Sequence, residues 1–163
     1  MVTTRPMPRP SLPPLDRGPL PRLLGYALRR AQSAVFADFA ASVRLGGRSA
    51  SPGELGLLVL VRHNPGISQA ALARGLGIDR STLQPILDRL QARALLRRDP
   101  VPEDARRHAL ALTAAGSRAL AAALVQVRRH EARLAAPLDR AEAATLHALL
   151  DKVRAGLRSA QRA

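Results

Sequence analysis

The 163-residue chain has no cysteine and no tryptophan, and its only aromatic side chains are Tyr26, Phe36 and Phe39. The lack of cysteine excludes disulfides, thiolate nucleophiles and zinc–thiolate sites. No apolar run approaches the roughly 20 residues that cross a bilayer. The first 21 residues also lack the apolar segment of a signal peptide. These absences predict a cytoplasmic protein with no membrane partner.

Acidic residues are scarce as well. There are 12 Asp and Glu against 26 Lys and Arg, a formal net charge of +14, and Lys152 is the one lysine. Such an excess of positive charge favours an anionic partner, most often a nucleic acid. The arginines are spread along the whole chain, so charge alone does not locate a site.

Signatures of an enzyme are missing too. The chain has no glycine-rich phosphate loop, no nucleophile next to a base and no paired carboxylates. The four histidines are scattered at positions 63, 108, 130 and 147, which argues against a metal site. We therefore expect neither catalysis nor a cofactor.

The pattern of apolar residues predicts six helices and one β-hairpin. Seven prolines within residues 1–21 predict an extended, disordered tail. Apolar residues then recur every three or four positions. Predicted helices span 23–43, 52 to a stop at 63–66, 69–76, 80–94, 114–135 and 139–160. The predicted strands are 95–98 and 107–113, with a turn at 99–105 between them.

Three consecutive helices followed by a hairpin are typical of a winged helix-turn-helix. We therefore predict a mainly α fold with a small β-hairpin wing, in which residues 51–113 bind DNA. The third of these helices would enter the major groove, and Arg106 and Arg107 at the hairpin tip would reach the minor groove. The candidate DNA-binding residues are Ser68, Gln69, Arg80, Ser81, Thr82, Gln84, Asp88, Arg106 and Arg107.

Two motifs carry a resemblance to a known family. The stretch from Asp104 to Thr113 resembles the D-x-R-x-x-x-L-x-L-T wing signature of the MarR family of bacterial transcription regulators. Residues 78–83, running into 87–90, resemble that family's recognition helix. The resemblance covers roughly residues 20–160. There are two departures: Ala94 stands where the family often has glycine, and Pro85 lies inside the recognition helix.

The resemblance implies a homodimer on double-stranded DNA, with 22–48 and 114–160 as a helical dimerisation region. It implies that Asp104 orients Arg106 in the wing. Residues 24–32 resemble members that control the breakdown of aromatic acids, which implies a small anionic aromatic effector. Its candidate ligands are Tyr26, Arg30, Phe36 and His63, which offer apolar walls and a cation for a carboxylate.

Two functional hypotheses follow. In the first, the chain is a homodimeric repressor, released from a near-palindromic operator by a small aromatic acid or its CoA thioester. In the second, it is an architectural protein that binds nucleic acid through its charge, without sequence preference. A structural alternative to the dimer is that the three flanking helices pack within one chain.

Overall fold

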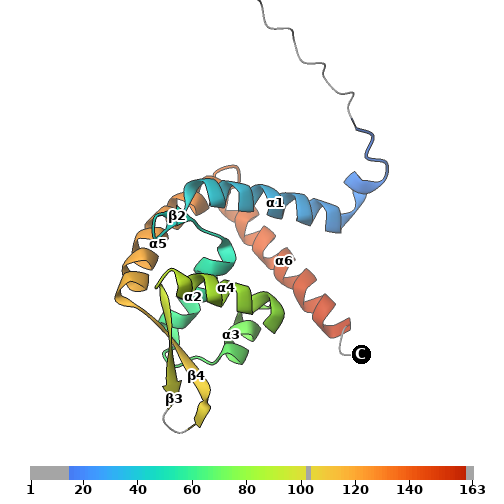
Figure 1. The fold of residues 1–163 in the computed structure, drawn as a ribbon. Coiled ribbons are helices and arrows are strands. Elements are labelled where there is room, and N and C mark those ends of the chain that lie inside the picture. Colours follow the sequence, from blue (N-terminus) through green and yellow to red (C-terminus); the bar gives the residue numbers. More distant parts are fainter. Residues whose placement is uncertain (1–14, 102–103, 161–163) are drawn as a thin grey trace, which may run out of the picture. The chain divides into compact units, whose positions relative to one another are not determined.

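The structure, a computed structural model, describes residues 15–101 and 104–160 (Figure 1). In chain order the elements are η1 (Leu20–Arg22), α1 (Leu24–Ser42), β1 (Arg44–Leu45), β2 (Arg48–Ser49), α2 (Pro52–His63), α3 (Gln69–Leu76), α4 (Arg80–Ala92), β3 (Leu96–Val101), β4 (Asp104–Leu112), α5 (Ala114–Ala135) and α6 (Arg140–Ala160). The chain divides into two compact units, residues 1–33 and 34–163, and α1 runs across the boundary. The predicted fold class, mainly α with a small hairpin, is confirmed.

Side-chain caps fix where the helices begin. At α2, Ser51 and Glu54 form a reciprocal capping box, with Pro52 in the first turn. The Ser68 hydroxyl accepts the backbone N–H of Ala71 at the start of α3. These caps confirm the predicted starts. Thr113, predicted as the last residue of a strand, instead caps α5 by accepting the N–H of Gly116.

The β3–β4 hairpin is longer than predicted. It is antiparallel, pairs Leu96 with Leu112, and extends to Val101 opposite Asp104. Figure 1 shows it extending away from helices α2–α4. The predicted turn over 99–105 is therefore wrong at 99–101 and at 104–105, which are strand. A two-stranded sheet tolerates Pro100 because each strand has a free edge, and the register becomes irregular after this residue.

A second, very short hairpin was not predicted. The expectation that Gly46 and Gly47 end the first helix is wrong, because α1 already ends at Ser42 and the two glycines form the turn between β1 and β2. Both glycines have positive φ, 54° and 80°, which tight hairpin turns of this length need. Ala94 also has a positive φ, of 51°. It thus takes the left-handed conformation that the family leaves to glycine, and α4 ends at Ala92 rather than at Ala94.

The predicted tail departs from an extended chain at its end. Residues 1–14 lie outside the described residues, and Leu20–Arg22 form the 3₁₀ helix η1. Pro21 occupies the first turn of η1, where its missing N–H costs no hydrogen bond.

A leucine-rich core lies under α4 and the β3–β4 hairpin, the two elements predicted to contact DNA. Leu83, Leu87 and Leu90 on one face of α4 are fully buried. They belong to one apolar cluster with leucines of α2, α3, β4 and α5, among them Leu57, Leu58, Leu72, Leu110 and Leu120. Because buried leucines occupy one face of α4, its exposed polar side chains lie around the rest of the helix, and Gln84 and Gln91 at the edge of the buried face are half-buried.

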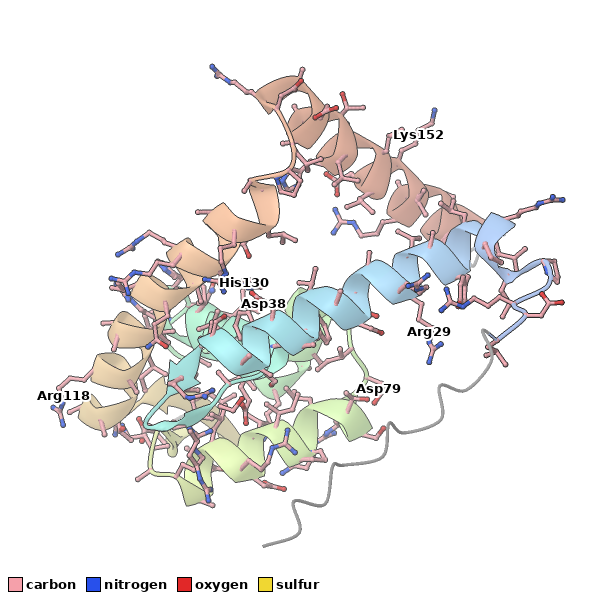
Figure 2. The ribbon with its side chains drawn as sticks, turned by 90° about the horizontal axis from the view of Figure 1, so that it is seen from above. Arg29, Asp38, Asp79, Arg118, His130 and Lys152 are labelled. Atoms are coloured by element: carbon pink, nitrogen blue, oxygen red, sulfur yellow. The ribbon has the colours of Figure 1, made fainter. Side chains whose placement is uncertain are left out.

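A buried histidine joins α5 to the end of α1. The His130 ring is 1% exposed, stacks edge-on against Phe39, and its Nδ1 lies 2.7 Å from Oδ2 of Asp38. Figure 2 shows Asp38 and His130 side by side. Arg133 donates to the same carboxylate oxygen at 2.7 Å. Hydrogen bonds from Arg133 and His130 lower the pKa of Asp38, so the carboxylate is charged at neutral pH.

Several helices expose apolar side chains. Along α6 every described residue is exposed except Ala143 and Val153, which are half-buried. The exposed leucines of α6 are Leu146, Leu149, Leu150 and Leu157. No helix in the described part of the chain is both long and apolar enough to cross a membrane.

Gly116 and Gly156 give a test of the packing at the start of α5. A methyl group on Gly116 would overlap the backbone carbonyl of Leu95, whereas one on Gly156 in α6 would meet nothing within 4 Å. We expect Gly116→Ala to destabilise the fold by about 1–3 kcal/mol through overpacking. Gly156→Ala should instead stabilise α6 by about 0.5–1 kcal/mol. Urea denaturation measures both, and equal effects from the two would contradict the packing described.

Candidate nucleic-acid interface

The turn between α3 and α4 sets the direction of α4. Helix α3 ends on Gly77, which is left-handed with φ 67° and ψ 33°. The next N–H, of Ile78, donates back to the carbonyl of Ala73 at 3.1 Å. A left-handed residue of this kind is readily supplied by glycine and turns the chain sharply. Only three residues, 77–79, therefore separate α3 from α4.

Asp79 caps α4 and gathers the first polar side chains of the helix. Its Oδ1 accepts the N–H of Thr82 at 2.7 Å and the hydroxyl of Ser81 at 2.6 Å, and its Oδ2 accepts the Thr82 hydroxyl at 3.1 Å. The bond from Ser81 is the largest of the causes that lower the pKa of Asp79 to about 2. Figure 2 shows Asp79 at the start of α4. Both hydroxyls thus donate within the cap, and their lone pairs remain free to accept hydrogen bonds.

The outward face of α4 presents Arg80, Gln84 and Asp88. Arg80 is exposed and has no ion-pair partner among the side chains that the structure describes. The helix is continuous through Pro85. The Nε2 of Gln84 donates to Oδ1 of Asp88 at 2.7 Å. The predicted major-groove residues of this helix therefore all reach solvent beside the buried leucine face, with Gln84 half-buried at its edge.

The start of α3 and the hairpin hold the other predicted residues. Ser68 and Gln69 are half-buried where α3 begins. The backbone of Asp104, Arg106 and Arg107 lies in β4, but their side chains lie outside what the structure describes. The predicted roles of these residues stay predictions.

Two ion-pair clusters that hold α4 in place were not predicted. Glu54 is buried, and its Oε1 lies 3.6 Å from Arg89 of α4 and 3.6 Å from Arg93, which caps the end of that helix. Arg93 also donates to the carbonyl of Leu45 in β1. The spacing of Arg89 and Arg93, one turn apart, is the sequence signal for a shared acidic partner, but only the fold identifies that partner as Glu54.

The second cluster joins α4 to the hairpin. Arg98 of β3 brings its NH2 to 3.4 Å from Oδ1 of Asp88. Next to it, Arg97 pairs with Asp99 at 2.8 Å. The recognition helix and the base of the wing are thus connected by charge as well as by the apolar core.

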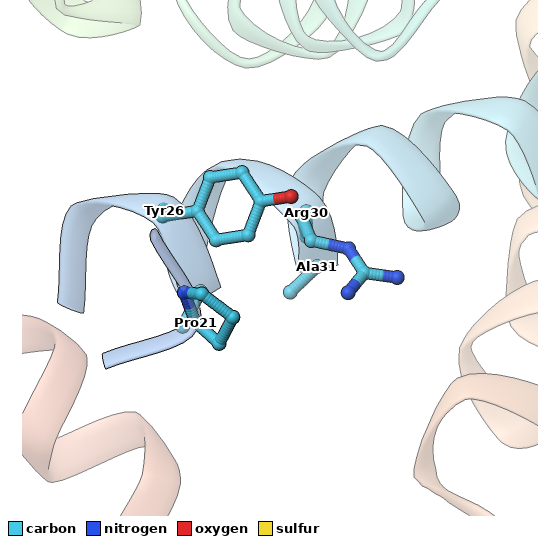
Figure 3. Close-up of a pocket in the computed structure, with 5 residues that line it drawn as sticks. Pro21, Tyr26, Arg30 and Ala31 are labelled. Atoms are coloured by element: carbon cyan, nitrogen blue, oxygen red, sulfur yellow. The ribbon is translucent and has the colours of Figure 1, made fainter. Parts of the chain in front are cut away.

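The structure brings together two of the four residues predicted to contact the effector. The guanidinium carbon of Arg30 lies 5.9 Å from the centre of the Tyr26 ring, within cation–π range. Both line a hollow of about 390 Å³ with Pro21, Ala27 and Ala31 (Figure 3). Phe36 and His63 do not line this hollow. Phe36 is 46% exposed on α1, and His63 ends α2.

A second hollow of about 390 Å³ lies between the end of α2 and strand β4, and Arg62, Asp99 and Ser117 supply most of its polar side chains. Among the described residues no three His, Asp or Glu side chains gather as metal ligands would.

Comparison with known proteins identifies the family. The model of the MarR family matches residues 50–107. A putative transcriptional regulatory protein for the hcr operon of Thauera aromatica is 37% identical over 139 residues, which are 85% of this chain and 83% of that protein.

Solved structures agree. The transcriptional repressor CouR, bound to a 23-mer DNA duplex, is 39% identical, with a TM-score of 0.75, 87% of this chain covered and 99% of that chain. PcaV of Streptomyces coelicolor, in complex with its natural ligand, is 28% identical with a TM-score of 0.76. The match covers 88% of this chain and 97% of the PcaV chain. The relatives are transcriptional regulators, not enzymes, and this chain belongs to the MarR family of transcriptional regulators.

Proposed function

We propose that this regulator is a homodimeric repressor that binds a near-palindromic operator and leaves it when a small aromatic carboxylate or its CoA thioester binds. The observation that carries the proposal is the exposed polar start of α4, where Arg80, Ser81 and Thr82 reach solvent while three buried leucines anchor the helix in the core. No acidic side chain that the structure describes pairs with Arg80. Such a helix places its N-terminal half against base edges, while arginines that contact the DNA phosphates fix the position of the protein on the duplex.

In this proposal, α4 would contact the major groove and the wing would contact the minor groove. Arg80 suits the paired acceptors of guanine, and Gln84 suits adenine. Ser81 and Thr82 would accept from bases, since their own hydrogens go to Asp79. Ser68 and Gln69 would contact phosphates at the start of α3. In the wing, Arg106, oriented by Asp104 and flanked by Arg107, would enter the minor groove, as the family resemblance implies.

A second copy would complete the DNA contacts. One winged helix makes few base contacts, whereas two on a two-fold axis read half-sites about 34 Å apart. The exposed leucines of α6 and the exposed Phe36 of α1 support a dimerisation region formed by 22–48 and 114–160. A monomer rarely leaves so many large apolar side chains in water. Their exposure in the single chain supports this dimer over packing within one chain.

The hollow around Tyr26 and Arg30 is our candidate for the effector site. Its apolar walls suit an aromatic ring, and the guanidinium of Arg30 suits a carboxylate. One solved structure of CouR, 37% identical to this chain, has p-coumaroyl-CoA bound. We propose the same chemical class here, with Phe36 and His63 as further candidates.

The wing arginine tests the mode of DNA binding. We expect Arg106→Ala to weaken binding to the DNA upstream of the chain's own gene by about 1–3 kcal/mol, because a minor-groove contact is lost. Arg140→Ala on α6 removes the same charge outside the reading surface and should leave affinity nearly unchanged. Fluorescence anisotropy at fixed salt measures both. Equal wild-type affinity for random DNA would favour the architectural alternative instead.

The apolar face of α6 tests the dimer. Leu149→Asp should dissociate the protein into folded monomers, because Leu149 is 54% exposed in the single chain and its charge would be buried at the interface. Leu15→Asp makes the same change at a residue that is 83% exposed and should leave the dimer intact. Sedimentation velocity reports the mass. A wild-type monomer at micromolar concentration would refute the dimer.

The effector site is tested with p-coumaroyl-CoA and free p-coumarate. We expect one of these compounds to release the protein from operator DNA. Arg30→Ala should weaken the binding of that compound by about 1.5–3 kcal/mol, because a charge-assisted hydrogen bond to its carboxylate is lost. Arg29→Ala is the matched control, since Arg29 does not line the hollow. Calorimetric titration measures the affinity. If both variants bind like wild type, the effector does not use this hollow.

A further inference from the structure

Three side chains form a hydrogen-bonded row on the surface proposed to read DNA. Gln84 and Asp88 stand one turn apart on α4, and Nε2 of Gln84 donates to Oδ1 of Asp88 at 2.7 Å. From β3, NH2 of Arg98 approaches the same oxygen at 3.4 Å. Asp88 is exposed, and Gln84 is half-buried at the edge of the face that buries Leu83, Leu87 and Leu90, so both reach the solvent side of α4. The row therefore lies where bases would be read.

The bond to Asp88 limits what Gln84 can offer to a base. A glutamine amide has two N–H donors and one oxygen acceptor. One N–H is taken by Asp88, which leaves one donor and Oε1. That remaining pair matches adenine, whose major-groove edge presents the N6 amino donor and the N7 acceptor. Guanine presents two acceptors, O6 and N7, and would need both amide hydrogens.

Asp88 is itself poorly suited to touch the operator. Its carboxylate is negative, and the surrounding phosphates repel it. Its Oδ1 already accepts from Gln84 and is approached by Arg98, the only ion-pair partner of that guanidinium among the described side chains. Arg98 offsets the charge of Asp88 and holds the carboxylate against the base of the wing. This pairing keeps Asp88 in place beneath Gln84.

We infer that Asp88 is a specificity-determining positioning residue, which holds the Gln84 amide so that it accepts adenine and rejects guanine at one position of each half-site. The inference rests on the proposed DNA-binding function. It assigns to Asp88 a role through Gln84 in place of a direct contact with a base.

Base preference, rather than affinity alone, tests this role. The wild type, Asp88→Ala and Asp88→Asn are titrated with operators in which each half-site position is replaced in turn by the other three base pairs. We expect the wild type to prefer A·T over G·C at one position by about tenfold or more. Asp88→Ala should reduce that preference to about threefold or less, because both amide hydrogens of Gln84 become free. Removal of the negative charge should also raise its affinity for random DNA.

The other variants separate positioning from charge and from folding. Asp88→Asn keeps an oxygen that accepts from Gln84 and should retain the preference. Asp151→Ala removes a carboxylate that pairs with Arg154 on α6 at 2.7 Å, the same change of charge, and should also retain it. Gln84→Ala should lose the preference at the same position, and the double variant Gln84→Ala with Asp88→Ala should lose no more.

Two results would overturn the inference. One is a folded Asp88→Ala protein, checked by its thermal transition, that keeps the wild-type preference at every position. The other is an Asp88→Asn protein that loses the preference as Asp88→Ala does, since charge rather than the acceptor would then be responsible. A wild type with equal affinity for every sequence would instead refute the proposed function, and the inference with it.

Discussion

The burial of one face of α4 is the constraint on which the rest of the reading surface depends. Leu83, Leu87 and Leu90 have no exposed surface and share a core with leucines of α2, α3, β4 and α5. Rotating α4 would bring these leucines into water, at about 1.5–3 kcal/mol for each side chain. The helix therefore has one orientation, which leaves Arg80 and Asp88 exposed and Gln84 half-buried at the edge of the leucine face.

Hydrogen bonds and ion pairs then fix the side chains of α4, the helix that the apolar core orients. Asp79 holds the hydroxyls of Ser81 and Thr82, while Asp88 holds Gln84 and pairs with Arg98 of the wing. On the far side of α4, the buried Glu54 joins Arg93 to the start of α2, and Arg93 reaches the carbonyl of Leu45. A buried carboxylate is stable only when it is paired and hydrogen-bonded in this way. The recognition helix is thus held from α2, β1 and β3 at once.

The same hairpin that α4 contacts through Leu45 also contacts α5. The N–H of Arg44 in β1 donates to Oε1 of Gln126 at 2.8 Å, and the Ser49 hydroxyl of β2 donates to Ala40 of α1 at 2.6 Å. This hairpin, six residues long with its turn, therefore contacts the residue that caps the end of α4 and the helices proposed to form the dimer. Together with the Asp38–His130 bond between α1 and α5, it provides a continuous path of packed groups between the two regions.

The sequence by itself determined where most elements begin and end and which family the chain resembles. Ser51, Ser68, Asp79 and the glycines act through backbone bonds only a few residues away, so their effect can be read locally. The extent of the wing and the β1–β2 hairpin escaped prediction, because strands are defined by their partners. The pairs Asp88–Arg98 and Asp38–His130 were decided by tertiary structure alone, since no local pattern couples residues 10 or 92 positions apart. Packing brought them together, and it thereby decided which donors and acceptors remain for the contacts that we propose with DNA.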